Sequence, residues 1–226
     1  MAKIKFGMMM TDARGKLGGQ VFSKNRAGAY VRTKVTPTNP RTVAQMASRS
    51  LLASLSIGWN ALTNAQRLSF DNAVEAWQKT DIFGDLKKPT GKNLYVGLNK
   101  NLGGAGLPLI TDAPDKIEIP TILNPTATFD DTAETLTLSV TTVPTGMVLQ
   151  VAATPPLNAG VNFVKNRLRV IANVPAGAVS PATLYAAYAA RFGTVADGAN
   201  VHIQLKYIAD NGQAGIPTTV RAVVTP

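Results

Sequence analysis

The sequence predicts a multidomain α+β protein with an N-terminal extended arm and β-hairpin, a small helical bundle and a C-terminal antiparallel β-sandwich. Apolar residues recur at helical spacing in the first half of the chain and alternate with polar residues from about residue 126. The chain also begins with a basic, glycine-rich stretch. The expected segments are residues 1–41 (arm and hairpin), 42–103 (helices), 104–125 (linker) and 126–226 (sandwich).

The arm carries most of the positive charge. The 226-residue chain has a net charge of +10, and in its first 50 residues Asp12 is the only acidic residue. A basic arm beside a neutral second half indicates an acidic partner, either nucleic acid or an acidic protein surface. The candidate subunit or nucleic-acid contact residues are Lys16, Lys24, Arg26, Tyr30, Arg32, Lys34, Arg41 and Arg49.

The arm contains one predicted hairpin. Residues 20–24 and 29–35 read as strands joined by a turn at 24–28. A two-stranded hairpin is marginally stable in water, so we expect it to lean on the helices or on another chain. The glycines of residues 15–19 (GKLGG) match neither the P-loop nor the dinucleotide-binding pattern, and they indicate flexibility or close backbone approach instead.

A proline-rich hinge separates the arm from the first helix. Pro37 and Pro40 remove two backbone donors and exclude both a helix and a central strand. Thr42 and Gln45 have the spacing of a capping box at a helix start. We therefore expect a stiff joint that presents the arm at one angle.

The helical segment is expected to form a bundle that closes over two tryptophans. The first helix carries an apolar row at i+4 spacing that runs from Val43 to Trp59. A second capping box, Thr63 with Gln66, starts a helix in which Phe70, Val74 and Trp77 share one face. A third helix, residues 92–102, is expected to stop at Gly103-Gly104.

The second half reads as six or seven strands in about 100 residues, which favours a small sandwich of the immunoglobulin or fibronectin III type. Ser180-Pro181 supplies the first residues of an inserted helix that ends at Gly193. The clearest strands are expected at residues 136–140, 148–153, 168–174, 201–207 and 220–224, with turns at 130–131 and 210–212.

The sequence offers no catalytic centre. The single histidine, His202, falls on the polar phase of a strand, and Asp130 and Asp131 are adjacent in a turn. There is no cysteine, and no apolar run approaches the roughly 20 residues that a membrane helix needs. We expect no enzyme activity, cofactor, metal, small-molecule substrate or membrane partner, and an origin in the cytoplasm.

Much of the first 100 residues resembles an N-terminal module found in uncharacterised proteins of tailed bacteriophages and prophages, which are taken to be virion components. The matching strings are residues 15–50, WNALTNAQRLSF and GKNLYVGLN, less than half of the chain. The module implies no catalytic residue. The features that carry the resemblance are Gly18-Gly19, Arg26, Gly28, Tyr30-Val31-Arg32, Pro37, Asn39-Pro40-Arg41-Thr42, Gln45, Arg49, Trp59, Leu62-Thr63 and Gln66-Arg67.

The resemblance implies a non-enzymatic structural protein of a bacteriophage virion, made in the host cytoplasm. It would assemble in multiple copies through its arm, in the capsid, the head–tail connector or the tail, with copies of itself and other virion proteins as partners. The alternative is a nucleic-acid-binding protein whose arm neutralises packaged DNA. A carbohydrate-binding or hydrolytic tail module lacks the aromatic platform and spaced carboxylates that sugar chemistry requires.

Overall fold

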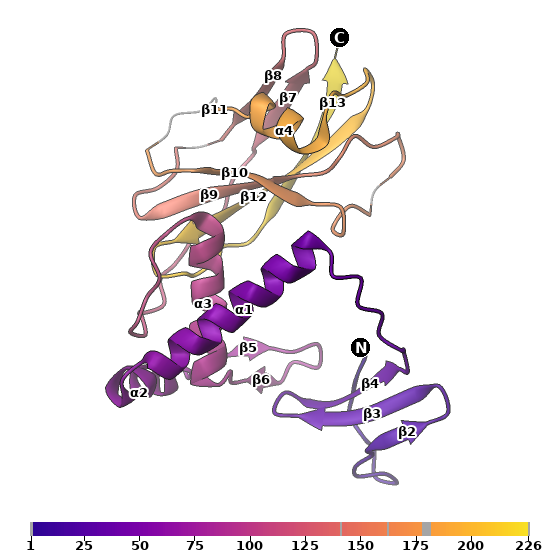
Figure 1. Cartoon of the computed structure of the whole chain (residues 1–226), viewed down its shortest axis with the longest axis vertical. Coiled ribbons are helices and arrows are strands. Elements are labelled where there is room, and N and C mark those ends of the chain that lie inside the picture. The colour runs from indigo at the N-terminus through magenta and orange to yellow at the C-terminus, as the bar shows by residue number, and fades with distance from the viewer. Residues whose placement is uncertain (1, 141, 162, 178–181, 226) are drawn as a thin grey trace. The chain divides into compact units, whose positions relative to one another are not determined.

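The protein is a mixed α+β chain whose strands pair mostly antiparallel (Figure 1). The computed structural model describes residues 2–140, 142–161, 163–177 and 182–225, and in these ranges the chain forms four helices and three β-sheets. Two compact units, Met1–Val96 and Gly97–Pro226, divide within the third helix. The α+β class is confirmed, and the four-segment division of the sequence stays a prediction.

The first unit begins with a four-stranded antiparallel sheet in the order β1-β4-β3-β2, here called the N-terminal sheet. The predicted hairpin is confirmed as β3 and β4, but Asn25 pairs with Gly28, so the turn is only two residues long. The two flanking strands were not predicted. The bounds are β1 Ala2–Ile4, β2 Gly15–Leu17, β3 Gln20–Asn25 and β4 Gly28–Thr33.

Residues 34–42, here called the hinge, form no helix or strand and lead into α1 (Val43–Ala61). The Thr42 hydroxyl accepts a hydrogen bond from the Gln45 backbone N–H at 3.3 Å, so the predicted helix start is confirmed. The prediction of a reciprocal bond from the Thr42 backbone to the Gln45 side chain is wrong, because the buried Gln45 Oε1 has no hydrogen-bond partner among the described residues. Only half of this capping box exists.

Helix α2 (Asn64–Ala73) begins with the second predicted capping box, in which both bonds between Thr63 and Gln66 are present. The helix ends before Trp77, which the sequence placed on its face, yet Trp77 is buried in the turn that follows. Two short strands, β5 (Lys79–Thr80) and β6 (Leu86–Lys87), then form a hairpin that the sequence did not predict.

Helix α3 (Gly91–Ala105) runs through Gly103-Gly104, so the predicted stop at these glycines is wrong. The helix ends at Gly106, which has a left-handed φ of 75°, and the Leu107 N–H donates to the Leu102 carbonyl at 2.9 Å. This is the Schellman arrangement, which needs a residue with positive φ immediately after the helix. The sequence offered three glycines there, and only the last adopts that conformation.

The core of the first unit is an aromatic cluster rather than a pair of tryptophans. The ring of Trp59 lies 5.9 Å from that of Phe70 and 5.5 Å from that of Tyr95, and the Phe70 and Tyr95 rings are 5.4 Å apart. Edge-on and tilted pairs at these distances add to the free energy of burial. The third helix therefore supplies a ring that the predicted helical hairpin lacked.

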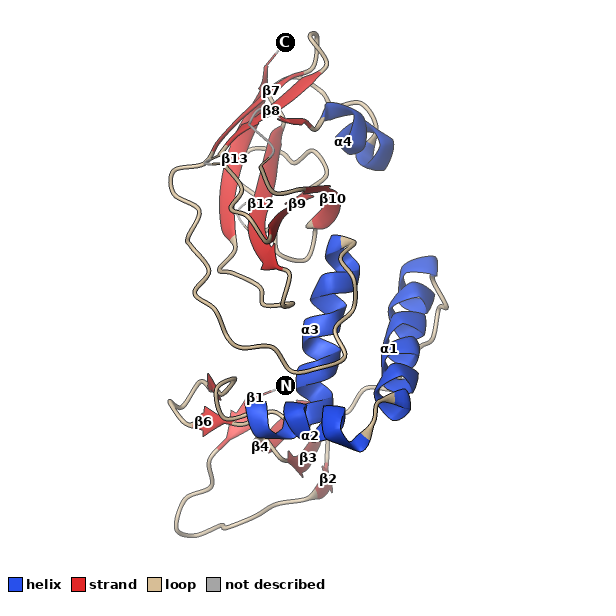
Figure 2. Ribbon diagram, turned by 90° about the vertical axis from the view of Figure 1, so that its left-hand side faces the viewer, coloured by secondary structure: helices blue, strands red, loops and turns tan. Residues whose placement is uncertain are grey.

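The second unit is a curled seven-stranded sheet in the order β10-β9-β12-β13-β7-β8-β11, in which β13 and β7 pair in parallel (Figures 1 and 2). An immunoglobulin-type sandwich is not confirmed. The strand bounds are β7 Thr126–Asp130, β8 Thr135–Ser139, β9 Met147–Ala153, β10 Arg169–Val174, β11 Ala182–Thr183, β12 Asn200–Ala209 and β13 Thr218–Thr225.

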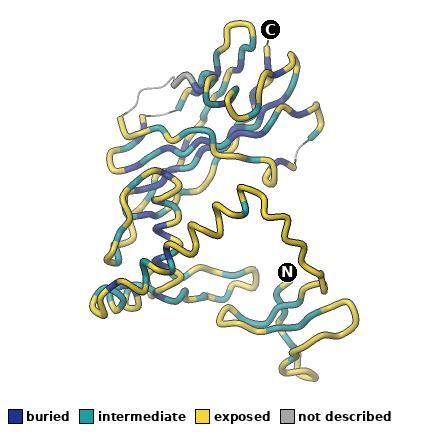
Figure 3. The backbone as a smooth tube through the Cα atoms, in the orientation of Figure 1, coloured by how far each residue is buried: buried dark blue, intermediate teal, exposed yellow. Residues whose placement is uncertain are grey.

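Strand alternation builds the core of this unit, as the dark central strands of Figure 3 show. Val151 of β9 lies opposite Leu205 of β12, and both side chains are fully buried. Helix α4 (Tyr185–Phe192) adds Tyr188, whose hydroxyl donates to the Thr154 carbonyl at 3.0 Å. The predicted end of this helix at Gly193 is confirmed. The predicted start is wrong, because residues 182–183 form strand β11 and the helix begins at Tyr185; Ser180 and Pro181 themselves lie outside the described residues.

Residues 107–125, most of the predicted linker, form no helix or strand but make hydrogen bonds within the second unit. The Asn99 side chain donates to the Ile110 carbonyl and accepts from the Ile110 N–H, and Gln213 makes the same pair of bonds with Ile117. Ile122 is buried in the core of the sheet. This segment is therefore anchored at several points, although most of its residues are exposed.

Candidate assembly surface

The N-terminal sheet buries no residue in the part of the chain that the structure describes. Its register places Phe22 opposite Val31 and Val31 opposite Ala2, so these residues share one face. Phe22 and Val31 are only half-buried. An apolar sheet face normally packs against another layer, so this face is available to a partner.

The predicted contact residues are divided between the two faces. Lys16 pairs with Val21, which pairs in turn with Arg32, so the two cations flank one valine in a cross-strand row. Tyr30, two residues from Arg32, shares their face, whereas Lys24 lies on the face of Phe22. The candidate residues therefore do not form one continuous patch.

Among the described residues, Asp12 is the only carboxylate at ion-pair distance from a candidate contact residue, which is Lys24. Its carboxylate lies 3.5 Å from Arg14 Nε and 3.9 Å from Lys24 Nζ. These distances in exposed side chains give weak pairs. The candidate cations with no carboxylate at ion-pair distance in the described ranges are Lys16, Arg26, Arg32, Lys34, Arg41 and Arg49.

Arg49 makes a hydrogen bond within the chain. From α1, its Nη1 donates a hydrogen bond to Asn39 Oδ1 in the hinge at 2.8 Å. Hinge residue Arg41 has a left-handed φ of 50°, which is uncommon for a residue other than glycine. The joint is thus held by a side-chain bond and carries backbone strain.

The N-terminal half of α1 is exposed (Figure 3), so the predicted buried stripe is wrong except at the C-terminal end of the helix. Leu55 is 2% exposed, but Leu52 is 55% and Val43 88% exposed. Arg49 is the one charged residue in the sequence of this helix. An apolar helix with almost no charge is typically covered on several sides, so the first turns of α1 form a second uncovered surface.

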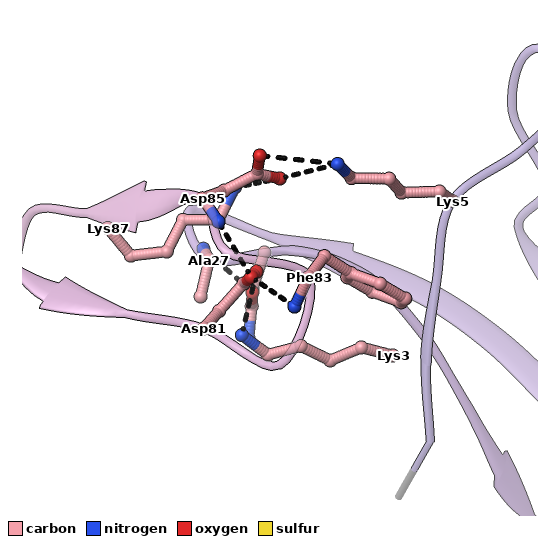
Figure 4. A network of polar contacts seen from close by, with 8 residues as sticks. Lys3, Lys5, Ala27, Asp81, Phe83, Asp85 and Lys87 are labelled. Atoms are coloured by element: carbon pink, nitrogen blue, oxygen red, sulfur yellow. Dashed lines mark hydrogen bonds and ion pairs between the residues drawn. The ribbon is translucent and has the colours of Figure 1, made fainter.

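The first unit also contains an ionic cluster between the chain start and the loop of the β5–β6 hairpin (Figure 4). Lys3 Nζ lies 3.2 Å from Asp81 Oδ2, and Lys5 Nζ lies 3.0 Å from Asp85 Oδ2. Lys5 also sits 5.4 Å from the centre of the Phe83 ring, a cation–π distance. These lysines are engaged within the chain.

Asp81 is fixed by its own hairpin. Its Oδ1 accepts from the backbone N–H groups of Phe83 at 2.8 Å and Asp85 at 3.2 Å, and its side chain is only 4% exposed. Desolvation raises the pKa of Asp81, but the bonds from Phe83, Lys3 and Asp85 outweigh it, so the net pKa lies below its ordinary value. The carboxylate is ionised and oriented for a cation at neutral pH.

Sequence reasoning missed this cluster because it counted Lys3 and Lys5 only as arm charge. Asp81, Gly84 and Asp85 are turn-forming residues, a signal that indicates the hairpin loop. The partner of that loop lies nearly 80 residues away in the chain, and no local pattern predicts it.

The residues considered for catalysis lie in a turn and on a strand of the second unit. Asp130 Oδ1 accepts from the Ala133 N–H at 2.7 Å, which confirms its turn role, and His202 lies on the half-buried phase of β12. In the described ranges, no three His, Cys, Asp or Glu side chains are grouped to hold a metal ion. No described helix is both long and apolar enough to cross a membrane.

Comparison of the chain with protein-family models, curated proteins and solved structures returned no match.

Proposed function

We propose that this chain is a non-enzymatic structural component of a bacteriophage virion, present in multiple copies in the capsid, the head–tail connector or the tail. The observation that carries the proposal is the uncovered surface of the first unit. The N-terminal sheet has no buried residue among those described, and the N-terminal half of α1 is largely apolar and exposed. Burying such surface yields roughly 25 cal/mol per Å², which favours assembly over a free chain.

Copies of the same chain and other virion proteins are the proposed partners. The exposed cations around the sheet and hinge, of which Lys16 and Arg32 share a row, would meet acidic surfaces of neighbouring subunits. The virion is the proposed location of the chain.

For the second unit we propose an immunoglobulin-type module that is displayed on the particle or docks to another shell. The order β10-β9-β12-β13 supports this, since it matches the C′-C-F-G order of one sheet of a variable-type domain. The order β7-β8-β11 likewise matches A-B-E of the other sheet. The parallel pair of β13 and β7 would then mark the edge where the two halves meet.

Mass spectrometry and immunogold electron microscopy of particles purified from a host that produces the chain test the function. We expect the chain in the particles in many copies, with label at one repeated location. Absence from purified particles, with the chain abundant in the host lysate, would rule the proposal out. Sedimentation of the purified chain gives its copy number in solution.

A nucleic-acid-binding role is the second candidate, favoured by the row that holds Lys16 and Arg32 without carboxylate partners in the described chain. Binding of duplex DNA should then fall steeply between about 50 and 200 mM salt. The double variant Lys16→Ala/Arg32→Ala should weaken binding and reduce the salt slope. Lys165→Ala/Arg167→Ala, which removes two exposed cations of the second unit, is the matched control. Lack of binding at low salt removes this candidate.

A further inference from the structure

We propose that the N-terminal sheet of one copy docks on the β5–β6 hairpin of a second copy, through the Lys3–Asp81 and Lys5–Asp85 contacts seen here within one chain. This exchange of the N-terminal sheet between copies rests on the proposed multicopy assembly. The sheet that binds to the hairpin of one copy thus comes from a second copy of this chain, and each pair of neighbouring copies shares the same two ionic contacts.

The sheet is separable from the rest of the unit. All nine hinge residues, 34–42, are exposed and form no regular structure (Figure 3). Because no described residue of β1, β2, β3 or β4 is buried, removal of the sheet opens no core. The polar contacts that join the chain start to the hairpin are ion pairs, which re-form without repacking.

The hinge carries backbone strain at one residue. Arg41 holds a left-handed φ of 50° between Pro40 and the helix cap Thr42. Pro37 and Pro40 keep the connection extended, since the residue before each proline is biased away from helical conformations. Short, strained hinges favour exchange of an element between copies.

The receiving surface is preformed on each copy. The two backbone N–H groups that orient Asp81 come from Phe83 and Asp85 in the same hairpin, not from the sheet that docks there. Lys3 and Lys5 of any copy therefore meet the same carboxylates in the same positions. Exchange preserves the charge complementarity of each contact and requires no new surface.

Local concentration decides between the two arrangements. Because the hinge ties the sheet to its own unit, the effective concentration of the chain's own hairpin is on the order of millimolar, so a dilute chain docks its own sheet. Fully extended, a nine-residue hinge reaches about 30 Å, far enough to span to an adjacent subunit. Within an array of copies, a neighbour's hairpin is as available as the chain's own.

Zero-length carbodiimide cross-linking of the unaltered protein tests the exchange. Unlabelled and ¹⁵N-labelled chains are unfolded together, refolded as an equal mixture, concentrated to the millimolar range or assembled into particles, and then cross-linked. The reagent joins the Lys3 amine to the Asp81 carboxylate, and mass spectrometry reads the isotopes of the linked peptides. Full exchange predicts that about half of these peptides carry one labelled and one unlabelled partner.

Linked peptides that are all of uniform isotope, at the highest concentration and in particles, would overturn the exchange. If sedimentation then still shows multimers, or the chain is present in virions, the proposed function stands while the exchange fails. A chain that is monomeric throughout and absent from particles removes both proposals.

Charge reversal provides an independent measurement. Two double variants are compared, Lys3→Asp/Lys5→Asp and Asp81→Lys/Asp85→Lys. Each variant alone has like charges on its sheet and its own hairpin. In a mixture of the two, opposite charges meet only between chains. We expect each variant alone to sediment as a smaller species than the mixture. The control is Lys165→Asp/Arg167→Asp mixed with Asp81→Lys/Asp85→Lys, which should gain nothing. Equal sedimentation of the two mixtures would contradict the exchange.

Discussion

The guanidinium of Arg49 donates a hydrogen bond to the side-chain oxygen of Asn39 at 2.8 Å, and this bond joins the hinge to the exposed part of α1. Arg49, which the sequence predicted to contact a partner, thus fixes the direction from which the hinge enters α1. Charged hydrogen bonds contribute more than neutral ones, yet an exposed pair contributes at most about 1 kcal/mol to global stability. Its effect is therefore expected in the local order of the hinge.

Arg49→Ala should free the hinge while leaving the fold intact. We expect faster proteolytic cleavage within residues 34–42 and little change in the thermal unfolding midpoint, because the lost bond is local and exposed. Arg26→Ala, which removes an exposed cation without an ion-pair partner in the described chain, is the matched control. Equal cleavage of the two variants would show that the bond does not order the hinge.

Substitution by alanine at two glycines of α3 should have opposite effects on stability. A Cβ at Gly91 would lie 2.3 Å from Asp71 Oδ1 and 3.0 Å from the Asp71 backbone N, whereas a Cβ at Gly97 meets nothing within 4 Å. Gly91→Ala should destabilise the protein by roughly 1–3 kcal/mol through overpacking. Gly97→Ala should stabilise it by up to about 1 kcal/mol, since alanine is the better helix former.

Urea unfolding midpoints of the two α3 variants check this prediction. Shifts in the same direction would mean that α2 moves to admit the methyl group at Gly91.

Local patterns predicted the helices and the longer strands but not their surroundings. The capping box at Thr63 and the alternation that buries Val151 depend on neighbouring residues, and both are confirmed. The end of α3 was misplaced because the choice among nearby glycines depends on which one adopts a left-handed φ, as Gly106 does. Apolar spacing also predicted burial along all of α1, but burial requires a facing element, and none in the described chain covers Leu52.

The candidate site was predicted by charge alone. The count of cations located the basic sheet, but the strand register that separates Lys24 from Arg32 requires knowledge of the pairing. The distinction between an engaged lysine and a free one depends on a carboxylate far away in the sequence, as for Lys3 and Asp81. Long-range contacts of this kind leave no periodic signal.

The contact between Lys3 and Asp81 should weaken in acid. The pKa of Asp81 lies below its ordinary value, so its stabilising contribution is complete above that ordinary value and is lost as pH falls through the lower folded-state pKa. The amide NMR signal of Phe83, which donates to this carboxylate, should titrate in that acidic range. Asp81→Asn should abolish the titration of this signal. Titration centred at or above the ordinary carboxyl pKa would contradict the assignment.

The strain at Arg41 gives a prediction with a defined sign. A non-glycine residue in the left-handed region costs roughly 1–2 kcal/mol, so Arg41→Gly should relieve strain, partly offset by the greater freedom of glycine in the unfolded chain. We expect a small rise in the thermal midpoint of the dilute protein and, because the strained hinge favours exchange, fewer mixed-isotope Lys3–Asp81 peptides. Arg41→Ala removes the same charge but keeps the strained backbone and should do neither. If glycine and alanine behave alike, the charge of Arg41 rather than its backbone governs the hinge.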